Sequence, residues 1–235
     1  RPDSGIGFSI ITQLHLTAER ENFIVVYPDG LNLGWNSTKD ILGFRNEEWD
    51  DVQFLEDLVL NLNNQLNIDL NRVYATGFSN GGFMVQRLAC SAPDFFAAFS
   101  VLGATMIKQM GPFCHPDNPV PIMFMHGTED VSIRWQGDPN SYMPVIDSLY
   151  FWVTFNGCNL NPLEPELIPK KDEDAETFVA KITYGDCAFG GEMWFYGVQN
   201  GGHNWTGVPG VIRDEIAGLV NTDILASDVV WEYMS

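Results

Sequence analysis

Apolar residues recur along the chain in two patterns. A helical period runs from Phe8 to Glu21 and again from Val52 to Leu62, where Asp50 or Asp51 is placed to cap the helix. Continuous apolar runs of about five residues are typical of buried strands. Strands are therefore predicted at residues 23–27, 96–101 and 121–125. Further short strands are predicted at residues 72–76, 178–184 and 192–198, and a helix from Asp223 through Trp231 closes the chain.

This alternation of strands and helices predicts an α/β fold. A mostly parallel sheet with helices on both faces buries such continuous apolar strands. The 235 residues are enough for one such domain, so we expect a single catalytic domain over residues 1–235. The acidic, proline-bearing stretch 159–176 has no clear period and predicts an excursion on the surface.

One short motif suggests nucleophilic chemistry. The run Gly77-Phe78-Ser79-Asn80-Gly81 matches G-x-S-x-G, and many ordinary turns match it too. Here a predicted strand precedes the motif and a predicted helix follows it, which is the context of a nucleophile elbow. Ser79 is thus the candidate nucleophile, and the backbone N–H of Asn80 is a candidate donor to an oxyanion.

A serine hydroxyl needs a base to remove its proton and a carboxylate to orient that base. In hydrolases with this elbow the chain order is nucleophile, acid, base. His203, in a glycine-rich loop after the last strands, is the candidate base, and we expect its imidazole to be exposed. Asp130 is the candidate acid, with Glu129, expected to point outward, and Asp138 as rivals. The order disfavours the other histidines, His15, His115 and His126.

Two tryptophans flank turn-rich loops and are candidates for substrate binding. Trp35 and Trp205 would form an aromatic wall for an acyl or aryl group, although tryptophans more often serve as packing anchors.

Composition narrows the classes of partner. The chain has 31 acidic and 12 basic residues, a net charge of −19, which argues against nucleic acid as a partner because phosphate binding needs clustered lysine and arginine. No apolar run approaches the roughly 18 residues of a membrane span. We therefore expect a soluble protein with neither a nucleic-acid nor a membrane partner. The sequence does not indicate an oligomeric state.

Four cysteines form an even set without a C-x-x-C pair, so disulfides are expected rather than a metal site. Four cysteines allow three connectivities, of which the local one is favoured: Cys90 with Cys114 and Cys158 with Cys187. Disulfides persist in oxidising compartments. The chain is therefore expected to be secreted or periplasmic.

Together these landmarks resemble the secreted polyhydroxybutyrate depolymerase and feruloyl or acetylxylan esterase family of α/β-hydrolases. The similarity covers nearly the whole chain and includes FIVVYPDG at 23–30, GWN at 34–36, DDV at 50–52, GFSNGG at 77–82, LAC at 88–90, HGT at 126–128, NGC at 156–158 and GGHNW at 201–205. The resemblance implies an α/β-hydrolase fold and the triad Ser79, Asp130 and His203. It also implies the same disulfides, and hydrolysis of small or polymeric carboxylic esters through an acyl-enzyme without metal or organic cofactor.

The sequence departs from that family at its start. Members carry an upstream strand that ends in a His-Gly motif, and the loop after it supplies the second oxyanion amide. The His-Gly pair of this sequence, at 126–127, follows the nucleophile instead. We therefore expect an N-terminally incomplete sheet with an uncovered edge. Two alternatives stay open: a serine peptidase with the same triad, and a non-catalytic relic that binds esters or glycans.

Overall fold

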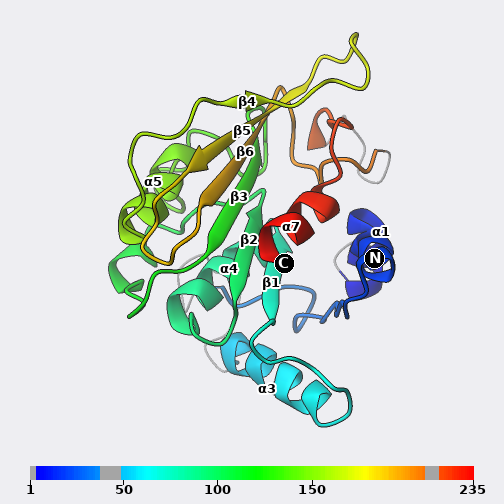
Figure 1. Ribbon diagram of the computed structural model, residues 1–235, viewed down its shortest axis with the longest axis vertical. Coiled ribbons are helices and arrows are strands. Elements are labelled where there is room, and N and C mark those ends of the chain that lie inside the picture. The colour runs from blue at the N-terminus through cyan, green and yellow to red at the C-terminus, as the bar shows by residue number, and fades with distance from the viewer. Residues whose placement is uncertain (1–3, 38–48, 210–216) are drawn as a thin grey trace.

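The computed structural model describes residues 4–37, 49–209 and 217–235 of the chain. Its strands are β1 (Tyr74–Phe78), β2 (Ala98–Leu102), β3 (Ile122–Gly127), β4 (Glu166–Leu167), β5 (Phe178–Tyr184) and β6 (Met193–Gln199). They form one sheet with the order β1-β2-β3-β6-β5-β4 (Figure 1). β1, β2, β3 and β6 run parallel, and β5 and β4 join through antiparallel pairs. The mostly parallel sheet predicted from the sequence is confirmed.

Helices cover both faces of this sheet. The helices are α1 (Gly5–Thr12), α2 (Leu14–Glu21), α3 (Asp51–Asn63), α4 (Asn80–Ser91), α5 (Val145–Phe155) and α7 (Ala226–Met234), with a 3₁₀ turn at Gly111–Phe113. α4 and α5 contact one side of β1, β2 and β3, and α7 packs between the sheet and α2 on the other side (Figure 1). The predicted α/β layering is therefore present.

β2 illustrates why both faces need helices. All of its residues are buried. Phe99 and Val101 belong to the apolar cluster beneath α4 and α5, whereas Ala98 and Leu102 belong to the cluster beneath α7. Since successive side chains of a strand point to opposite faces, a continuous apolar strand is stable only between two covering layers.

The N-terminal helical region is two helices rather than one. The helix predicted over residues 8–21 breaks at Gln13, whose φ of 52° lies in the left-handed region. Across the break, the hydroxyl of Thr12 accepts a hydrogen bond from the N–H of Leu14 (3.3 Å). Leu14 and Ala18 remain buried on the far side of the break. Apolar periodicity therefore persists through the turn and does not reveal it.

The buried strand predicted at residues 23–27 is wrong. The segment pairs with none of the described strands, and Ile24 and Val26 are 57% and 44% exposed. Phe23 is held instead by stacking on Trp231 of α7, with 4.1 Å between ring centroids. An apolar run becomes a strand only where a neighbour offers backbone groups to pair with, and no strand in the described part of the chain lies against this segment in that way.

A cavity of about 920 Å³ lies between this segment and β1. β1 is the edge strand of the described sheet, so the uncovered edge expected from the sequence is present. The apolar face of α3, including Leu55 and Leu58, lines the same cavity and is only partly buried. Asp50 caps α3 as predicted, since its carboxylate accepts the N–H groups of Val52 and Gln53.

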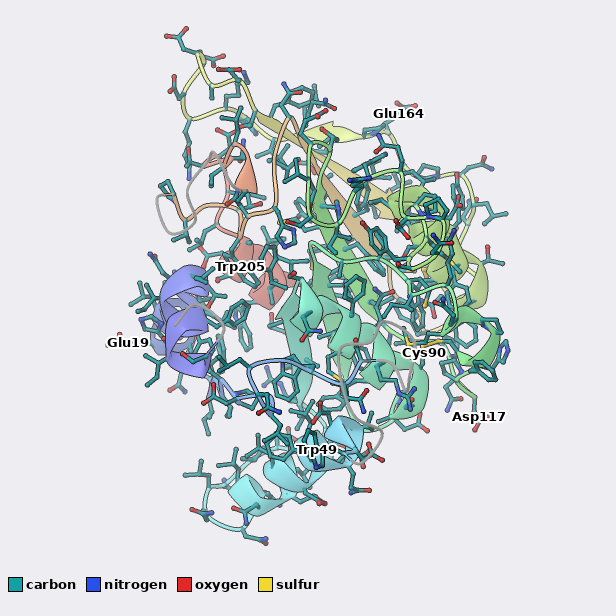
Figure 2. The ribbon with its side chains drawn as sticks, turned by 180° about the vertical axis from the view of Figure 1, so that it is seen from behind. Glu19, Trp49, Cys90, Asp117, Glu164 and Trp205 are labelled. Carbon is teal, nitrogen blue, oxygen red and sulfur yellow. A yellow bond between two sulfur atoms is a disulfide. The ribbon has the colours of Figure 1, made fainter. Side chains whose placement is uncertain are left out.

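Both favoured disulfide pairings occur in the structure, Cys90–Cys114 and Cys158–Cys187. Figure 2 labels Cys90, which lies near the end of α4. Residues 159–176 between the two cysteines of the second pair are mostly exposed, as predicted. None of the described helices combines the length and the apolar character that a bilayer crossing requires.

Asn156, directly after α5, links that helix by hydrogen bonds to the residues just before β3. Its side chain is fully buried. Its Oδ1 accepts the N–H of Val120 (2.7 Å), and its Nδ2 donates to the carbonyl of the same residue (2.8 Å). One amide side chain therefore satisfies both backbone groups of a buried residue that enters the sheet.

We expect Asn156→Leu to lower the free energy of unfolding by about 2–4 kcal/mol, because both backbone groups of Val120 would remain buried without partners. Denaturant unfolding followed by tryptophan fluorescence measures the change. Asn61→Leu, on the exposed side of α3, is the matched control and should change stability by less than about 0.5 kcal/mol. Equal effects of the two substitutions would contradict this role of Asn156.

Candidate active site

Ser79 lies at the sharp turn between β1 and α4. Its φ of 56° and ψ of −119° are a conformation that residues with a side chain rarely adopt, and neighbouring contacts must hold it. The N–H of Ser79 donates to the carbonyl of Leu102 in β2 (3.0 Å), and its own carbonyl accepts the N–H of Phe83 in α4 (3.1 Å). These bonds fix the hydroxyl above the carboxyl edge of the sheet.

Gly77 is needed where β1 passes the start of α4. A Cβ on Gly77 would fall against the carbonyl group of Gly81 and within 2.9 Å of the nitrogen of Gly82. Both are backbone atoms of the helix that follows the turn, so they cannot move aside as a flexible side chain would. The first glycine of the motif therefore has a steric reason.

Asp130 and His203 lie in the loops that follow β3 and β6. These strands are adjacent and parallel, so both loops leave the sheet at the same edge. The loops are also joined directly, because the N–H of Glu129 donates to the carbonyl of Gly201 (2.9 Å). The strand order therefore brings together two residues that are 73 positions apart.

The three candidate catalytic side chains form one hydrogen-bonded chain. His203 Nδ1 lies 2.7 Å from Asp130 Oδ2, and His203 Nε2 lies 2.9 Å from Ser79 Oγ. Because a carboxylate accepts hydrogen bonds, the ring proton is assigned to Nδ1, and Nε2 is left to accept from the serine hydroxyl. This is the geometry that general-base activation of a serine requires.

The carboxylate of Asp130 is almost completely buried but well supplied with donors. The side chain is 1% exposed. Its Oδ1 accepts the N–H groups of Ser132 (2.8 Å) and Ile133 (2.7 Å), while Oδ2 accepts from His203. A buried negative charge is tolerable only with such compensation, and the short turn after Asp130 supplies it.

The exposed imidazole expected for residue 203 is wrong, since His203 is only 8% exposed. The backbone N–H of His203 donates to the carbonyl of Ala217 (2.5 Å), and the Asn204 side chain donates to the carbonyl of Gly218 (2.9 Å). The ring lies 4.5 Å from that of Phe78. These partners come from distant segments, so the local glycine-rich pattern gave no sign of them.

The rival carboxylates do not contact His203. Glu129 is exposed. Asp138 accepts the N–H of Asn140 (2.9 Å), and this bond is the main reason that the pKa of Asp138 is lowered. Among the described residues, no three histidine, cysteine or acidic side chains gather where they could hold a metal ion.

Asn80 has a side-chain contact that the sequence did not reveal. Its Oδ1 accepts the N–H of Trp35 (2.6 Å), and its Nδ2 reaches the carbonyl of Trp35 (3.4 Å). Trp35 is thereby held beside the elbow, with its ring 6.4 Å from that of Phe54. The backbone N–H of Asn80 lies in the first turn of α4, where amides have no acceptor within the helix.

The two candidate substrate-binding tryptophans have different surroundings. Trp35 is partly exposed and lines the large cavity near Ser79. Trp205, labelled in Figure 2, borders the same cavity but is 1% exposed, and its indole N–H donates to Ser227 of α7 (3.2 Å). Its ring meets that of Phe78 edge to face at 6.4 Å. The contacts of Trp205 are those of a packing residue under the His203 loop.

Ser79, Asn80 and His203 open into the cavity of about 920 Å³ beside β1. Sites for small molecules typically measure about 300–1,000 Å³ and are largely apolar. The nucleophile therefore faces a space that is large enough for an acyl or aryl group.

Chain order removed His126 from the candidate residues, but the structure places it beside the acid. Its Nε2 lies 3.5 Å from Asp130 Oδ2. The spacing of four residues across the end of β3 is a signal that sequence reasoning could have used.

Curated relatives of the chain are esterases. Feruloyl esterase B of Piromyces equi is 28% identical over 165 residues, which are 64% of this chain and 30% of that protein. The putative esterase NocK of Nocardia uniformis subsp. tsuyamanensis is 22% identical over 238 residues, or 94% of this chain and 67% of that protein. Probable feruloyl esterase C of Aspergillus niger is 28% identical over 211 residues, which are 89% of this chain and 63% of that protein. No family model matches the chain.

A solved structure supports the fold. The acetyl xylan esterase from Aspergillus awamori superposes with a TM-score of 0.60 at 16% identity, over 86% of this chain and 80% of that one. The α/β-hydrolase fold and the resemblance to feruloyl and acetylxylan esterases are therefore confirmed. The chain spans from about a third to two thirds of the length of the three curated relatives described above.

Gly103, directly after β2, has no side chain, and this leaves space for the Phe78 and His203 rings. Its φ is +55°, and a Cβ there would lie 2.6 Å from Phe78 Cε2 and 3.4 Å from His203 Cε1. We expect Gly103→Ala to lower the free energy of unfolding by about 1–3 kcal/mol through overpacking and backbone strain. Because the imidazole shifts with the Phe78 ring, a fluorophosphonate should label Ser79 more slowly in this variant.

The matched control is Gly185→Ala, because a Cβ at Gly185 meets no atom within 4 Å and its φ is not positive. It should retain the labelling rate and the melting temperature of the wild type. Wild-type labelling of Gly103→Ala would contradict the steric role assigned to Gly103.

Proposed function

We propose that this relative of feruloyl and acetylxylan esterases is a serine esterase, which hydrolyses carboxylic esters through an acyl-enzyme. The observation that carries the proposal is the hydrogen-bonded chain from Asp130 through His203 to Ser79. The proposal includes a single catalytic domain over residues 1–235.

In the first half of the proposed reaction, Ser79 Oγ attacks the ester carbonyl while His203 Nε2 takes the hydroxyl proton. Asp130 holds the ring in the tautomer that leaves Nε2 free and stabilises the imidazolium that forms. When the tetrahedral intermediate collapses, the carbon–oxygen bond to the alcohol breaks. His203 gives its proton to the departing alcohol, and the acyl group stays on Ser79.

In the second half, water attacks the acyl group, with His203 again accepting a proton. Collapse of the second tetrahedral intermediate returns that proton to Ser79 Oγ and releases the carboxylic acid. Each half passes through an oxyanion, for which we propose the backbone N–H of Asn80 as one donor. One such donor is worth about 3–4 kcal/mol of transition-state stabilisation.

The substrate class follows from the relatives' names and from the cavity. Two of the relatives are named feruloyl esterases, and the similar structure is that of an acetyl xylan esterase. We propose feruloyl or acetyl esters of polymeric or small alcohols as substrates, with polyhydroxybutyrate as the third candidate, and Trp35 as a wall for the acyl group. Acyl transfer by this triad needs neither metal nor organic cofactor.

Two disulfides favour an oxidising compartment. We therefore propose that the enzyme is secreted or periplasmic, where polymeric esters are accessible. The strongly acidic composition gives a net charge of −19 at neutral pH. This charge is consistent with a neutral ester as substrate rather than a nucleic acid.

Ser79→Ala should reduce kcat/KM for p-nitrophenyl acetate by about 10⁵-fold to 10⁶-fold, because the acyl-enzyme cannot form. Stopped-flow or plate-reader release of p-nitrophenol measures this. Ser91→Ala, at the exposed end of the same helix, is the control and should retain the wild-type rate. Substantial turnover by folded Ser79→Ala would exclude Ser79 as the nucleophile.

A substrate panel separates the proposed function from its alternatives. We expect turnover of methyl ferulate or acetylated xylan and little hydrolysis of a matched p-nitroanilide, because no peptidase appears among the relatives compared above. Preferential cleavage of the anilide would indicate a peptidase. A folded protein that neither turns over an ester nor reacts with a fluorophosphonate at Ser79 would favour the non-catalytic alternative.

A further inference from the structure

His126 is a buried histidine beside the proposed acid, and the triad mechanism does not use it. It lies in β3, and its side chain is 2% exposed. Its ring meets that of Trp135 edge to face at 6.2 Å. Burying the nitrogens of an imidazole costs stability unless they are hydrogen-bonded, and burying a charged ring costs more. The contacts of His126 therefore indicate its role.

The protonation of His126 follows from its partners. Nε2 lies 2.7 Å from the carbonyl oxygen of Ile133, which can only accept, so Nε2 carries the ring proton. Nδ1 is buried and has no partner among the described residues. Burial also lowers the pKa of His126. The side chain is therefore a neutral imidazole with its proton on Nε2.

The bond from His126 closes the turn that supports the Asp130 carboxylate. The N–H of Ile133 donates to Asp130 Oδ1 (2.7 Å), while the carbonyl of Ile133 accepts from His126. The same Nε2 is 3.5 Å from Asp130 Oδ2, the oxygen that accepts from His203 Nδ1. His126 thus holds one end of the turn and also touches the oxygen that orients the base.

We propose that His126 is a positioning residue, whose Nε2–H fixes the turn from Asp130 to Ile133 so that Oδ2 points at His203. The inference rests on the proposed function, because it concerns the same triad. A neutral ring suits this role, since an imidazolium at residue 126 would place a second cation beside Oδ2. That cation would compete with His203 for the carboxylate.

The competing reading is that His126 only fills space next to Trp135. The two readings differ in what they require of the side chain. A space-filling role depends on ring volume, whereas the positioning role depends on an N–H at the place of Nε2. His126→Phe keeps an aromatic ring but removes the donor, and His126→Gln removes the ring but can put an amide N–H near the position of Nε2.

The experiment measures kcat and KM for p-nitrophenyl acetate in both variants, together with their melting temperatures. We expect His126→Phe to lower kcat about 10-fold to 100-fold with little change in KM, because a small misplacement of the base affects the chemical step more than binding. His126→Gln should recover most of that loss. Should His126→Phe fail to fold, His126→Asn replaces it, because its shorter amide cannot reach Ile133.

His115→Phe is the matched control. The Nε2 of His115 also bonds to a carbonyl, that of Pro112 (2.9 Å), but this residue is exposed and its contact lies outside the triad. The same chemical change there should leave kcat unaltered. Wild-type kcat in folded His126→Phe would overturn the proposal, as would equal losses in His126→Phe and His126→Gln.

A readout without turnover separates this inference from the proposed function. The Nδ1 proton of His203, hydrogen-bonded to Asp130, should give a downfield proton NMR resonance in the wild type, and we expect it to shift or broaden in His126→Phe and to return in His126→Gln. An unchanged resonance in His126→Phe would overturn the positioning role. If the wild-type protein shows this resonance but has no esterase activity, the proposed function is contradicted and the positioning role of His126 is not.

Discussion

Parallel pairing of β1, β2, β3 and β6 is the constraint on which the site depends. It makes the loops that carry Ser79, Asp130 and His203 leave one edge of the sheet. β1 and β6 are separated by two strands, each spaced about 4.8 Å from the next, so the imidazole must reach back over the end of β2 to meet the serine. Gly103 lies at that end, where a side chain would clash with the Phe78 ring that packs against the imidazole.

Hydrogen bonds to a single buried carboxylate then set the direction of the base. Asp130 accepts three N–H groups, two from its own turn and one from His203. Bonds to charged groups are worth about 1.5–3 kcal/mol each, which compensates for burying the charge and makes the orientation of Oδ2 specific. The His126 bond to Ile133 also links the end of that turn back to β3.

On the outer side of β1, away from β2, the elbow that carries Ser79 has no neighbouring strand among the described residues. The segment at 23–27 faces β1 across the large cavity. The Asn80 side chain still connects the elbow to Trp35 across this region. One wall of the site is thus a well-packed sheet with its loops, and the other is an apolar space into which the hydroxyl opens.

The sequence by itself determined the elements whose signal is local. Strand-like segments identified the paired strands except β4 (Glu166–Leu167), which lies in the stretch predicted to be an excursion. G-x-S-x-G in its strand–turn–helix context identified the turn at Ser79, because tight turns restrict the residue types they accept. Tertiary structure decided the rest. Residues 23–27 have the composition of a strand but pair with none of the described strands, and His203 is buried by segments far along the chain. The four-residue spacing of His126 and Asp130 is local, but their contact forms only because the turn after β3 folds back on the strand, and the spacing alone does not fix the distance between the two side chains.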